Sequence, residues 1–393
     1  MKILVLTPTF LPVVGGAEMV ILEMYRRLAA RHEVRLLTPS LPDRLVREQG
    51  SADYDGLVAF PVERYHDRVS FMKVPGHRWT AGAIPPFSLS AVAAVRRAVK
   101  AFGPDVLNVH YLMPTGLAGL IAERWLGVPT VATLSGRDVP GPGVPPLWRW
   151  WQRALLAGLS DATFISAYCR TAVYGRPSAA GHVIPAGVEL PPPRGDGAAR
   201  RAALGISRGE PMIFALQRLG VEKRTEVLMH ALRRCREACG AGELVVGGQG
   251  PELPRLQALA ERLGVAAHVR FAGYIPKGEL PSYFEACDVF AFHSSSETFG
   301  IVVAQAMSYG KPVVTVRNTA VPEVLGDAGI LVETGDGRGF GEALAGLIAD
   351  PDRRRRLGEA GRARAAACFN WDDVAARYET VLDRAAKRGR RAA

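Results

Sequence analysis

Short apolar runs alternate with amphipathic stretches along almost the whole chain, and this rhythm restricts it to one class of fold. Residues 2–6 are apolar, residues 17–30 have a helical pattern, and residues 34–38 are apolar again. Apolar strands separated by helices form parallel sheets that helices cover on both faces. The alternation starts afresh at residues 212–216 and continues to about residue 317. The sequence therefore predicts an α/β protein with two open parallel sheets in series.

A break in composition separates the two halves of this pattern. The chain has 393 residues, which is too many for one ordinary core, and Pro191-Pro192-Pro193 with Gly195-Asp196-Gly197 is typical of a linker. Ligands of open parallel sheets bind at the carboxyl ends of the strands, so we expect the ligand between the domains. We expect a Rossmann-like domain at 1–188, a linker at 189–209, a second Rossmann-like domain at 210–368, and a helix with a basic tail at 369–393.

Hydropathy and charge indicate where in the cell the protein is located and which kinds of partner it binds. No run of about 18 apolar residues lacks a charge, which predicts no membrane-spanning helix. Pro8 and Pro12 interrupt the apolar start, which favours a first strand over a signal peptide and predicts a cytoplasmic protein. The formal charge of +11 suits phosphates or an anionic membrane surface, which would allow peripheral contact, and it equally suits a merely solvated basic surface. The basic residues do not cluster with stacking aromatics along one helix, so no nucleic-acid partner is expected.

Three loops at the ends of expected strands carry residues suited to phosphate. Gly15-Gly16-Ala17-Glu18 opens a helix, where glycine lets the backbone approach an anion; a simple tight turn is an equal alternative. Arg218 and Lys223 follow the run 212–216, and two cations there suit a diphosphate. Gly248-Gln249-Gly250 lacks the third glycine of a dinucleotide fingerprint, so it indicates a phosphate-proximal turn rather than an NAD site.

The segment 294–312 is the most informative stretch. Glu297 precedes a short apolar helix, and Gln305 lies inside that helix. The helix start at Phe299-Gly300-Ile301 offers backbone N–H groups to a phosphate. A polar Gln305 among apolar neighbours needs a hydrogen-bond partner if it is buried.

Taken together, these motifs resemble the retaining glycosyltransferases of family 4, which have the GT-B fold. The resemblance implies that 1–188 binds the acceptor and 210–368 binds the nucleotide sugar. It also implies that the two domains face each other across a cleft and that the C-terminal helices cross back to the first domain. The resemblance covers almost the whole length and is strongest from 212 to 333. The order and spacing of the motifs make it specific. The matching residues are Gly15-Gly16-Ala17-Glu18, His110, Val183-Ile184-Pro185-Ala186-Gly187-Val188, Arg218, Lys223, Gly248-Gln249-Gly250-Pro251-Glu252 and Glu297.

The resemblance implies a role for each residue. Arg218 and Lys223 would bind the donor diphosphate, and Glu297 would hydrogen-bond the transferred sugar. His110 would lie beside the sugar as a hydrogen bonder rather than a base, and Gln305 would hold the ribose. The other donor-binding positions would be Gly16, Gly248, Gly250, Tyr274, Ile275, Phe299, Gly300 and Ile301, and the acceptor-side positions Gly15, Glu18 and Asp138.

Two departures from the family pattern bear on specificity. Gln305 stands where the family has a second Glu, and this exchange changes the ribose contact by about 1–2 kcal/mol. Thr319-Ala320 stands where the family commonly has Gly-Gly. We expect an altered nucleotide preference from the first and an altered sugar selectivity from the second.

The expected function is retaining transfer of a sugar from a nucleotide diphosphate, uridine type first, to an acceptor hydroxyl in cell-envelope glycan or glycolipid synthesis. No cofactor and no metal is expected, because Arg218, Lys223 and helix dipoles can stabilise the leaving group. A non-hydrolysing nucleotide-sugar epimerase and a non-catalytic sugar-nucleotide-binding partner subunit are the alternatives. Trp148-Arg149-Trp150-Trp151 suits a membrane interface or a lipid acceptor, or simply helix packing.

Overall fold

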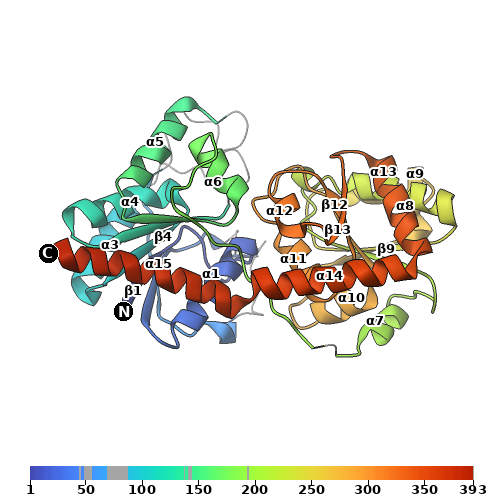
Figure 1. Ribbon diagram of the computed structural model, residues 1–393, viewed down its shortest axis with the longest axis horizontal. Coiled ribbons are helices and arrows are strands. Elements are labelled where there is room, and N and C mark those ends of the chain that lie inside the picture. The colour runs from blue at the N-terminus through green and yellow to red at the C-terminus, as the bar shows by residue number, and fades with distance from the viewer. Residues whose placement is uncertain are drawn as a thin grey trace. The chain divides into compact units, whose positions relative to one another are not determined.

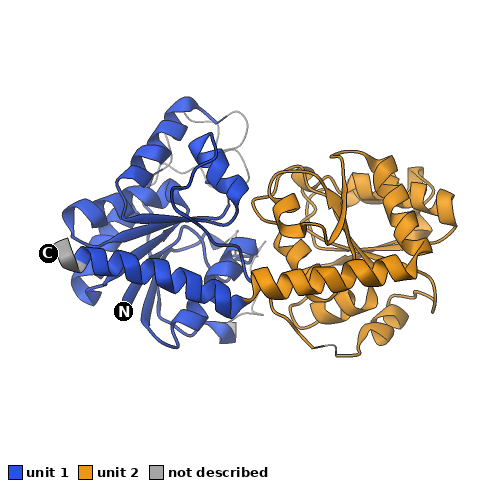
Figure 2. Cartoon of the chain, viewed as in Figure 1, with its two compact units in different colours: residues 1–187, 371–393 blue, residues 188–370 orange. Residues whose placement is uncertain are grey.

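The computed structural model describes residues 1–43, 46–47, 55–68, 87–136, 138–139, 144–192 and 194–392. The chain divides into two compact units (Figure 2). Unit 1 comprises Met1–Gly187 and Trp371–Ala393, and unit 2 comprises Val188–Asn370.

Unit 1 is built on a parallel sheet. Within the described residues it has seven strands in the order β3-β2-β1-β4-β5-β6-β7. The central strands are buried on both faces, as their mostly apolar sequences predict. The strands are β1 Lys2–Leu6, β2 Glu33–Pro39, β3 Val62–Tyr65, β4 Val106–His110, β5 Thr130–Leu134, β6 Asp161–Phe164 and β7 His182–Val183.

Helices cover this sheet, and the last of them comes from the end of the chain (Figure 1). Helix α15 lies along α1, where Arg27 pairs with Asp372 at 3.2 Å and His32 Nε2 lies 2.7 Å from Glu379. The chain therefore returns to unit 1, as expected. The helices are α1 Gly16–Leu28, α3 Leu89–Phe102, α4 Leu112–Trp125, α5 Pro146–Ala157, α6 Ala167–Tyr174 and α15 Trp371–Ala392, with a 3₁₀ turn η1 at Asp55–Leu57.

Unit 2 repeats the same architecture. Its described residues form six parallel strands in the order β10-β9-β8-β11-β12-β13. The strands are β8 Met212–Leu216, β9 Glu243–Gly247, β10 Val269–Gly273, β11 Val289–Phe292, β12 Val313–Val316 and β13 Gly329–Val332. The helices are α7 Gly197–Ala203, α8 Glu226–Cys239, α9 Leu253–Arg262, α10 Leu280–Ala286, α11 Ile301–Ser308, α12 Val321–Leu325, α13 Gly337–Ala349 and α14 Pro351–Phe369, with 3₁₀ turns η3 Val221–Lys223 and η4 Ala266–His268.

The unit boundaries differ from the expected ones. Residues 189–209 belong to unit 2 rather than to a separate linker. Within them α7 is anchored, because Arg201 pairs with Asp288 at 3.0 Å and Arg200 pairs with Glu279 at 2.7 Å. The proline and glycine content indicated where the sheet pattern breaks. It could not indicate the long-range ion pairs that attach α7 to unit 2.

The second boundary lies at Asn370 instead of 368. Asn370 has an extended backbone (ψ 128°) that ends α14 before α15 begins. The N–H of Val188 donates to Phe369 O at 2.8 Å, so the two boundary segments of unit 2 pair with each other. Asp350 caps the start of α14, since its carboxylate accepts from Arg353 N at 2.8 Å.

Candidate active site

The structure brings Lys223 and Glu297 together in unit 2. Lys223 lies in η3 after β8, and Glu297 lies in the loop after β11. These strands pair in parallel, so their following loops emerge at the same edge of the sheet. The Lys223 ammonium donates to the Glu297 carboxylate, and the side chains are 20% and 14% exposed. A sugar or phosphate oxygen reaching this edge would meet both charges.

Arg218 lies on the same connection and has its own acidic partner. Its guanidinium pairs with Glu222 at 2.6 Å, and both side chains are partly exposed. The backbone oxygen of Glu222 accepts from both the N–H and the hydroxyl of Ser295, each at 2.8 Å. Glu222 therefore ties the loop that carries the cations to the loop that carries Glu297. Sequence reasoning missed Glu222, although its spacing four residues after Arg218 is typical of a local ion pair.

Gly248 and Gly250 make room for the segment that carries Arg218. A Cβ atom on Gly248 would lie 2.0 Å from Gln217 O, and the φ of Gly248 is 116°. A Cβ atom on Gly250 would lie 2.2 Å from Leu219 O. Larger residues would push this segment away, so the glycines shape the site through packing. Their contact with the donor stays a prediction.

Helix α11 starts beside Glu297 and carries the other expected donor contacts. Gly300 is its N-cap with φ 89°, and Ile301 begins the helix, whose first N–H groups lack intrahelical partners. Phe299 is buried, with its ring edge-on to Phe369 at 5.5 Å, so it acts here in packing. Gln305 lies in the second turn and is half-buried.

The expected nucleobase positions follow β10 and differ from each other in exposure. Tyr274 is 46% exposed, whereas Ile275 is buried at 6%. Ile275 packs against β9, since its Cδ1 would lie 2.5 Å from a Cβ atom on Gly247. Tyr274 is thus accessible from solvent, whereas Ile275 lies in the core, and the nucleobase contact expected of both stays a prediction.

In unit 1, His110 ends β4 as a buried, neutral imidazole. Its Nε2 lies 3.0 Å from the Tyr25 hydroxyl, which also hydrogen-bonds Asn108. Burial lowers the pKa of His110 to about 3. A group that protonates so reluctantly is a poor base. The expected contact of His110 with the sugar stays a prediction. Sequence reasoning missed Tyr25 because it lies on α1, 85 residues from His110.

The glycine loop of unit 1 is folded around Glu18. Glu18 accepts a hydrogen bond from the Thr9 hydroxyl and is buried. A Cβ atom on Gly15 would lie 2.5 Å from Glu18 Oε2, so this position needs glycine or a shifted carboxylate. Gly16 is exposed at the first position of α1, where the helix dipole attracts anions.

Asp138 supports the turn that follows His110. Its buried carboxylate accepts from Leu112 N at 3.0 Å and from Gly136 N at 3.3 Å. Burial raises the pKa of Asp138 to about 6, although the backbone hydrogen bonds oppose the shift. The acceptor contact predicted for Asp138 is untested, and its hydrogen bonds show that it also holds the start of α4.

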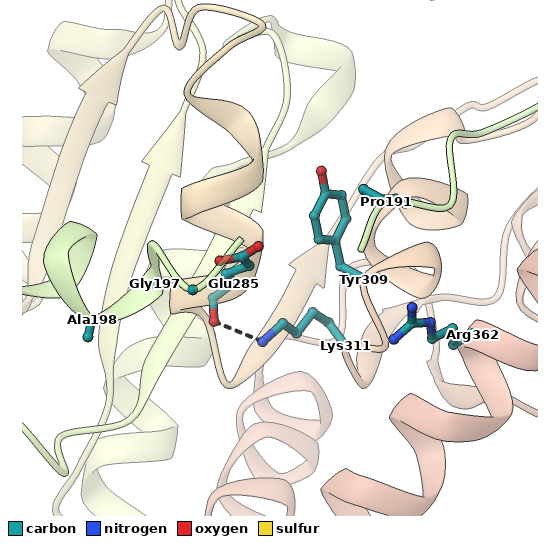
Figure 3. A pocket seen from close by; sticks show the side chains of 8 residues that line it. Pro191, Gly197, Ala198, Glu285, Tyr309, Lys311 and Arg362 are labelled. Carbon is teal, nitrogen blue, oxygen red and sulfur yellow. Dashed lines mark hydrogen bonds between the residues drawn. The ribbon is translucent and has the colours of Figure 1, made fainter. Parts of the chain in front are cut away.

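A cavity of about 370 Å³ in unit 2 is lined by none of the predicted site residues (Figure 3). Its acidic group, Glu285, accepts from Arg194 N at 2.6 Å and Asp196 N at 2.9 Å. The ammonium of Lys311 donates to the backbone oxygens of Glu285 and Cys287 at 3.0 and 2.8 Å. These charged groups stabilise local backbone, which explains them without a ligand.

The described residues contain neither a cluster of metal ligands nor a membrane-spanning helix. No group of three or more His, Cys, Asp and Glu side chains in that part of the chain could hold a metal ion. None of the helices described there is long and apolar enough to cross a membrane. On α5, Trp148 is buried at 4% exposure, whereas Trp150 is 61% and Leu147 49% exposed. The tryptophan segment therefore both packs on unit 1 and presents an apolar surface.

Sequence comparison decides the family. A family model described as "Glycosyltransferase Family 4" matches residues 14–190, and one described as "Glycosyl transferases group 1" matches residues 197–364. A GDP-mannose-dependent alpha-(1-6)-phosphatidylinositol monomannoside mannosyltransferase of Mycolicibacterium smegmatis is 30% identical over 96% of this chain and 97% of its own. The chain belongs to glycosyltransferase family 4. A D-inositol 3-phosphate glycosyltransferase of Xylanimonas cellulosilytica is 33% identical over 72% of this chain and 73% of its own.

Structural comparison agrees on the fold of this transferase. The structure of Anabaena HepE in complex with UDP and glucose matches with a TM-score of 0.78, covering 98% of this chain and 99% of HepE at 21% identity. The transferase therefore has the GT-B fold, as expected. Its membership makes it a sugar-transferring enzyme, and the residues at the β8 and β11 loop ends are its candidate donor site.

Proposed function

We propose that the transferase moves a sugar from a nucleotide diphosphate sugar to an acceptor hydroxyl with retention of anomeric configuration. The observation that carries the proposal is the Lys223–Glu297 pair, with Arg218 on the same connection. A departing diphosphate gains negative charge as the glycosidic bond breaks, and fixed cations lower the free energy of that state. Glu297 in turn accepts hydrogen bonds from sugar hydroxyls. The pair thus places an anion-binding group beside a sugar-binding group.

Retention is supported by His110, which is buried at the end of β4 in unit 1. The pKa of His110 is about 3, so its imidazole cannot take a proton efficiently near neutral pH. A mechanism in which the acceptor attacks from the face of the departing diphosphate lets a leaving-group oxygen take the proton instead. His110 then hydrogen-bonds the sugar, while Gly16 lends its backbone N–H to the phosphates. The anomeric configuration of the product, read by proton NMR, tests this assignment.

The nucleotide is proposed to be of the uridine type. HepE, a protein of the same fold, has been crystallised with UDP, whereas the mycolicibacterial relative is named as GDP-mannose-dependent. A thermal-shift panel of UDP, GDP and ADP and their sugars separates these cases. A ligand at 100 times its Kd should raise stability by about 2.7 kcal/mol. A shift with the guanosine series alone would replace the uridine assignment.

The acceptor is proposed to be a lipid-linked or small polyol hydroxyl used in cell-envelope glycan or glycolipid synthesis. The two relatives described above are named for acceptors of this class, a phosphatidylinositol mannoside and an inositol phosphate. The exposed Leu147 and Trp150 on α5 would let the enzyme rest on an anionic membrane as a peripheral protein in the cytoplasm.

No metal is proposed to take part, because Arg218 and Lys223 already supply positive charge to the diphosphate. Transfer assayed in excess EDTA should equal transfer in added Mg²⁺ or Mn²⁺. Loss of turnover in EDTA that Mg²⁺ or Mn²⁺ restores would overturn this part of the proposal.

The proposal as a whole is tested by Lys223→Ala with Arg233→Ala as its control. Arg233 is an exposed cation on α8 whose pair with Glu237 lies within one helix. The substrate is the nucleotide sugar that raises the melting temperature in the thermal-shift panel. The measured activity is the release of nucleoside diphosphate from it. Lys223→Ala should lower kcat about 10²- to 10³-fold, as expected for loss of a transition-state contact, while Arg233→Ala should not. Full activity of Lys223→Ala would contradict the assignment of Lys223 to the donor site.

A further inference from the structure

Thr319 has a backbone conformation that its side chain disfavours. Its φ is 49°, in the left-handed region, where a β-branched residue is a genuine outlier. Glycine adopts this conformation without a steric cost. Threonine at 319 therefore raises the free energy of the folded turn, and strain of this kind persists only where surrounding contacts impose it.

Four hydrogen bonds of the turn 318–320 lead to the loop that carries Glu297. The Thr319 hydroxyl accepts from Glu297 N at 2.9 Å, and Ala320 N donates to Glu297 O at 3.3 Å. The Asn318 amide donates to Ser294 O at 3.3 Å and also to Ser295 O. The turn 318–320 thus holds the backbone of Glu297 on both its N–H and its C=O side.

A glycine at position 319 would remove the strain but also the hydroxyl. The N–H of Glu297 would then lose its side-chain acceptor. The carboxylate of Glu297 would still meet Lys223, but from a backbone with more freedom. Thr319 keeps its strained conformation where its hydroxyl holds the backbone of Glu297. This is expected if the contact positions the Glu297 carboxylate.

We propose that Thr319 is a positioning residue, which fixes the backbone of Glu297 and thereby the grip on the transferred sugar. The inference rests on the proposed role of Glu297 as a sugar ligand. It assigns to Thr319 a share in sugar selection, because the angle at which the carboxylate meets the sugar depends on this turn. Thr319 itself does not touch the reacting atoms.

The test compares Thr319→Gly with Thr319→Ser. Thr319→Gly should melt at or above the temperature of the parent protein, because the left-handed strain is gone. Its kcat/KM with UDP-glucose, UDP-N-acetylglucosamine or GDP-mannose, whichever the parent uses, should nevertheless fall about 10- to 100-fold. The Kd for the matching free UDP or GDP should stay unchanged, because Glu297 is assigned to the sugar. Thr319→Ser keeps the hydroxyl and should retain activity within about twofold of the parent.

Two results would overturn the inference. One is Thr319→Gly with unchanged kcat/KM and unchanged sugar preference. The other is a parallel loss of melting temperature and activity that Thr319→Ser shares, which would mean a purely structural role. Amide hydrogen exchange over 294–297 is a measurement that needs no nucleotide sugar. The exchange should be faster in Thr319→Gly than in the parent, and unchanged in Thr319→Ser. Equal protection in both variants would also overturn the inference.

Failure of the proposed function would look different. Full activity of Lys223→Ala, or no binding of any nucleotide sugar by the parent, would remove the donor-site assignment. The exchange result would still decide whether Thr319 fixes the Glu297 backbone.

Discussion

The ammonium of Lys223 meets the carboxylate of Glu297 although the two residues lie 74 positions apart in the chain. Both side chains are mostly shielded from water, so their mutual attraction is screened less than in an exposed pair. The pair also leaves each group with capacity for further hydrogen bonds. The relationship therefore links the phosphate-binding role proposed for one residue to the sugar-binding role proposed for the other.

Glu297→Gln should separate these two roles. The substitution keeps the shape of the side chain but removes its charge, so sugar hydroxyls lose a strong acceptor. We expect kcat to fall about 10²-fold or more, as for other groups that act in the transition state. The Kd of the free nucleoside diphosphate, measured by calorimetry, should be unchanged or lower, because Lys223 no longer has an anionic partner. A weaker Kd for the nucleotide would contradict this division of roles.

Gln305→Glu should strengthen binding of the nucleotide. A carboxylate accepts a ribose hydroxyl more strongly than an amide oxygen does, and the half-buried position reduces the gain to about 1 kcal/mol, or roughly fivefold in Kd. Titration with UDP and with 2′-deoxy-UDP measures the effect, which should shrink for the deoxy ligand. Gln305→Ala is the control for loss of contact. Equal affinity of the parent and the Gln305→Glu variant for UDP would place the ribose elsewhere.

Asp138→Asn should change how stability depends on pH. The pKa of Asp138 is about 6 in the folded chain, above its ordinary 3.8, because burial disfavours the charged form. Between these values the folded state binds more protons than the unfolded state, so the free energy of unfolding falls as pH rises from about 4 to 6. The full effect of this carboxyl is roughly 2–3 kcal/mol.

Comparison of the variant with the parent isolates this contribution. The neutral His110, whose pKa is lowered from 6.5 to about 3, acts in the opposite direction over this whole range. Urea unfolding of both proteins from pH 4 to 7 is the measurement. The stability difference between parent and Asp138→Asn should shift in favour of the variant as pH rises. A pH-independent difference would contradict the raised pKa.

Trp150→Ala should weaken binding to anionic vesicles. Trp150 is 61% exposed on α5, and its ring would enter the interface between lipid head groups and chains. Loss of this apolar area should reduce the partition coefficient at least about threefold. Sedimentation with phosphatidylcholine vesicles containing phosphatidylglycerol measures it. Trp125→Ala, which removes a 77% exposed tryptophan outside α5, is the matched control. Equal sedimentation of Trp150→Ala and the parent would remove α5 from the proposed membrane contact.

Local patterns were sufficient for the architecture and for the family. The strand at 212–216 appears in the structure with those bounds, and the helical pattern at 17–30 corresponds to α1. Such features depend on neighbours within a few residues, so composition and periodicity reveal them. The ordered motifs from the glycine loop to Glu297 were likewise enough to predict the GT-B fold and glycosyltransferase family 4, both of which are confirmed.

What local patterns missed depends on contacts between distant parts of the chain. The assignment of 189–209 to unit 2 follows from the ion pairs of α7, and the boundary at Asn370 follows from an extended residue that no composition signal marks. The contact of Tyr25 with His110 was missed for the same reason.

The sequence by itself therefore determined the two parallel sheets, the family and the identity of the charged groups at the loop ends. Only the tertiary structure decided which of these groups meet: Lys223 with Glu297, Arg218 with Glu222, and the strained Thr319 with the backbone of Glu297. The physical reason is that periodicity and capping act over one or two turns of chain. Pairing across a sheet edge depends instead on strand order and on the path of each loop, which emerge only when the whole unit is packed.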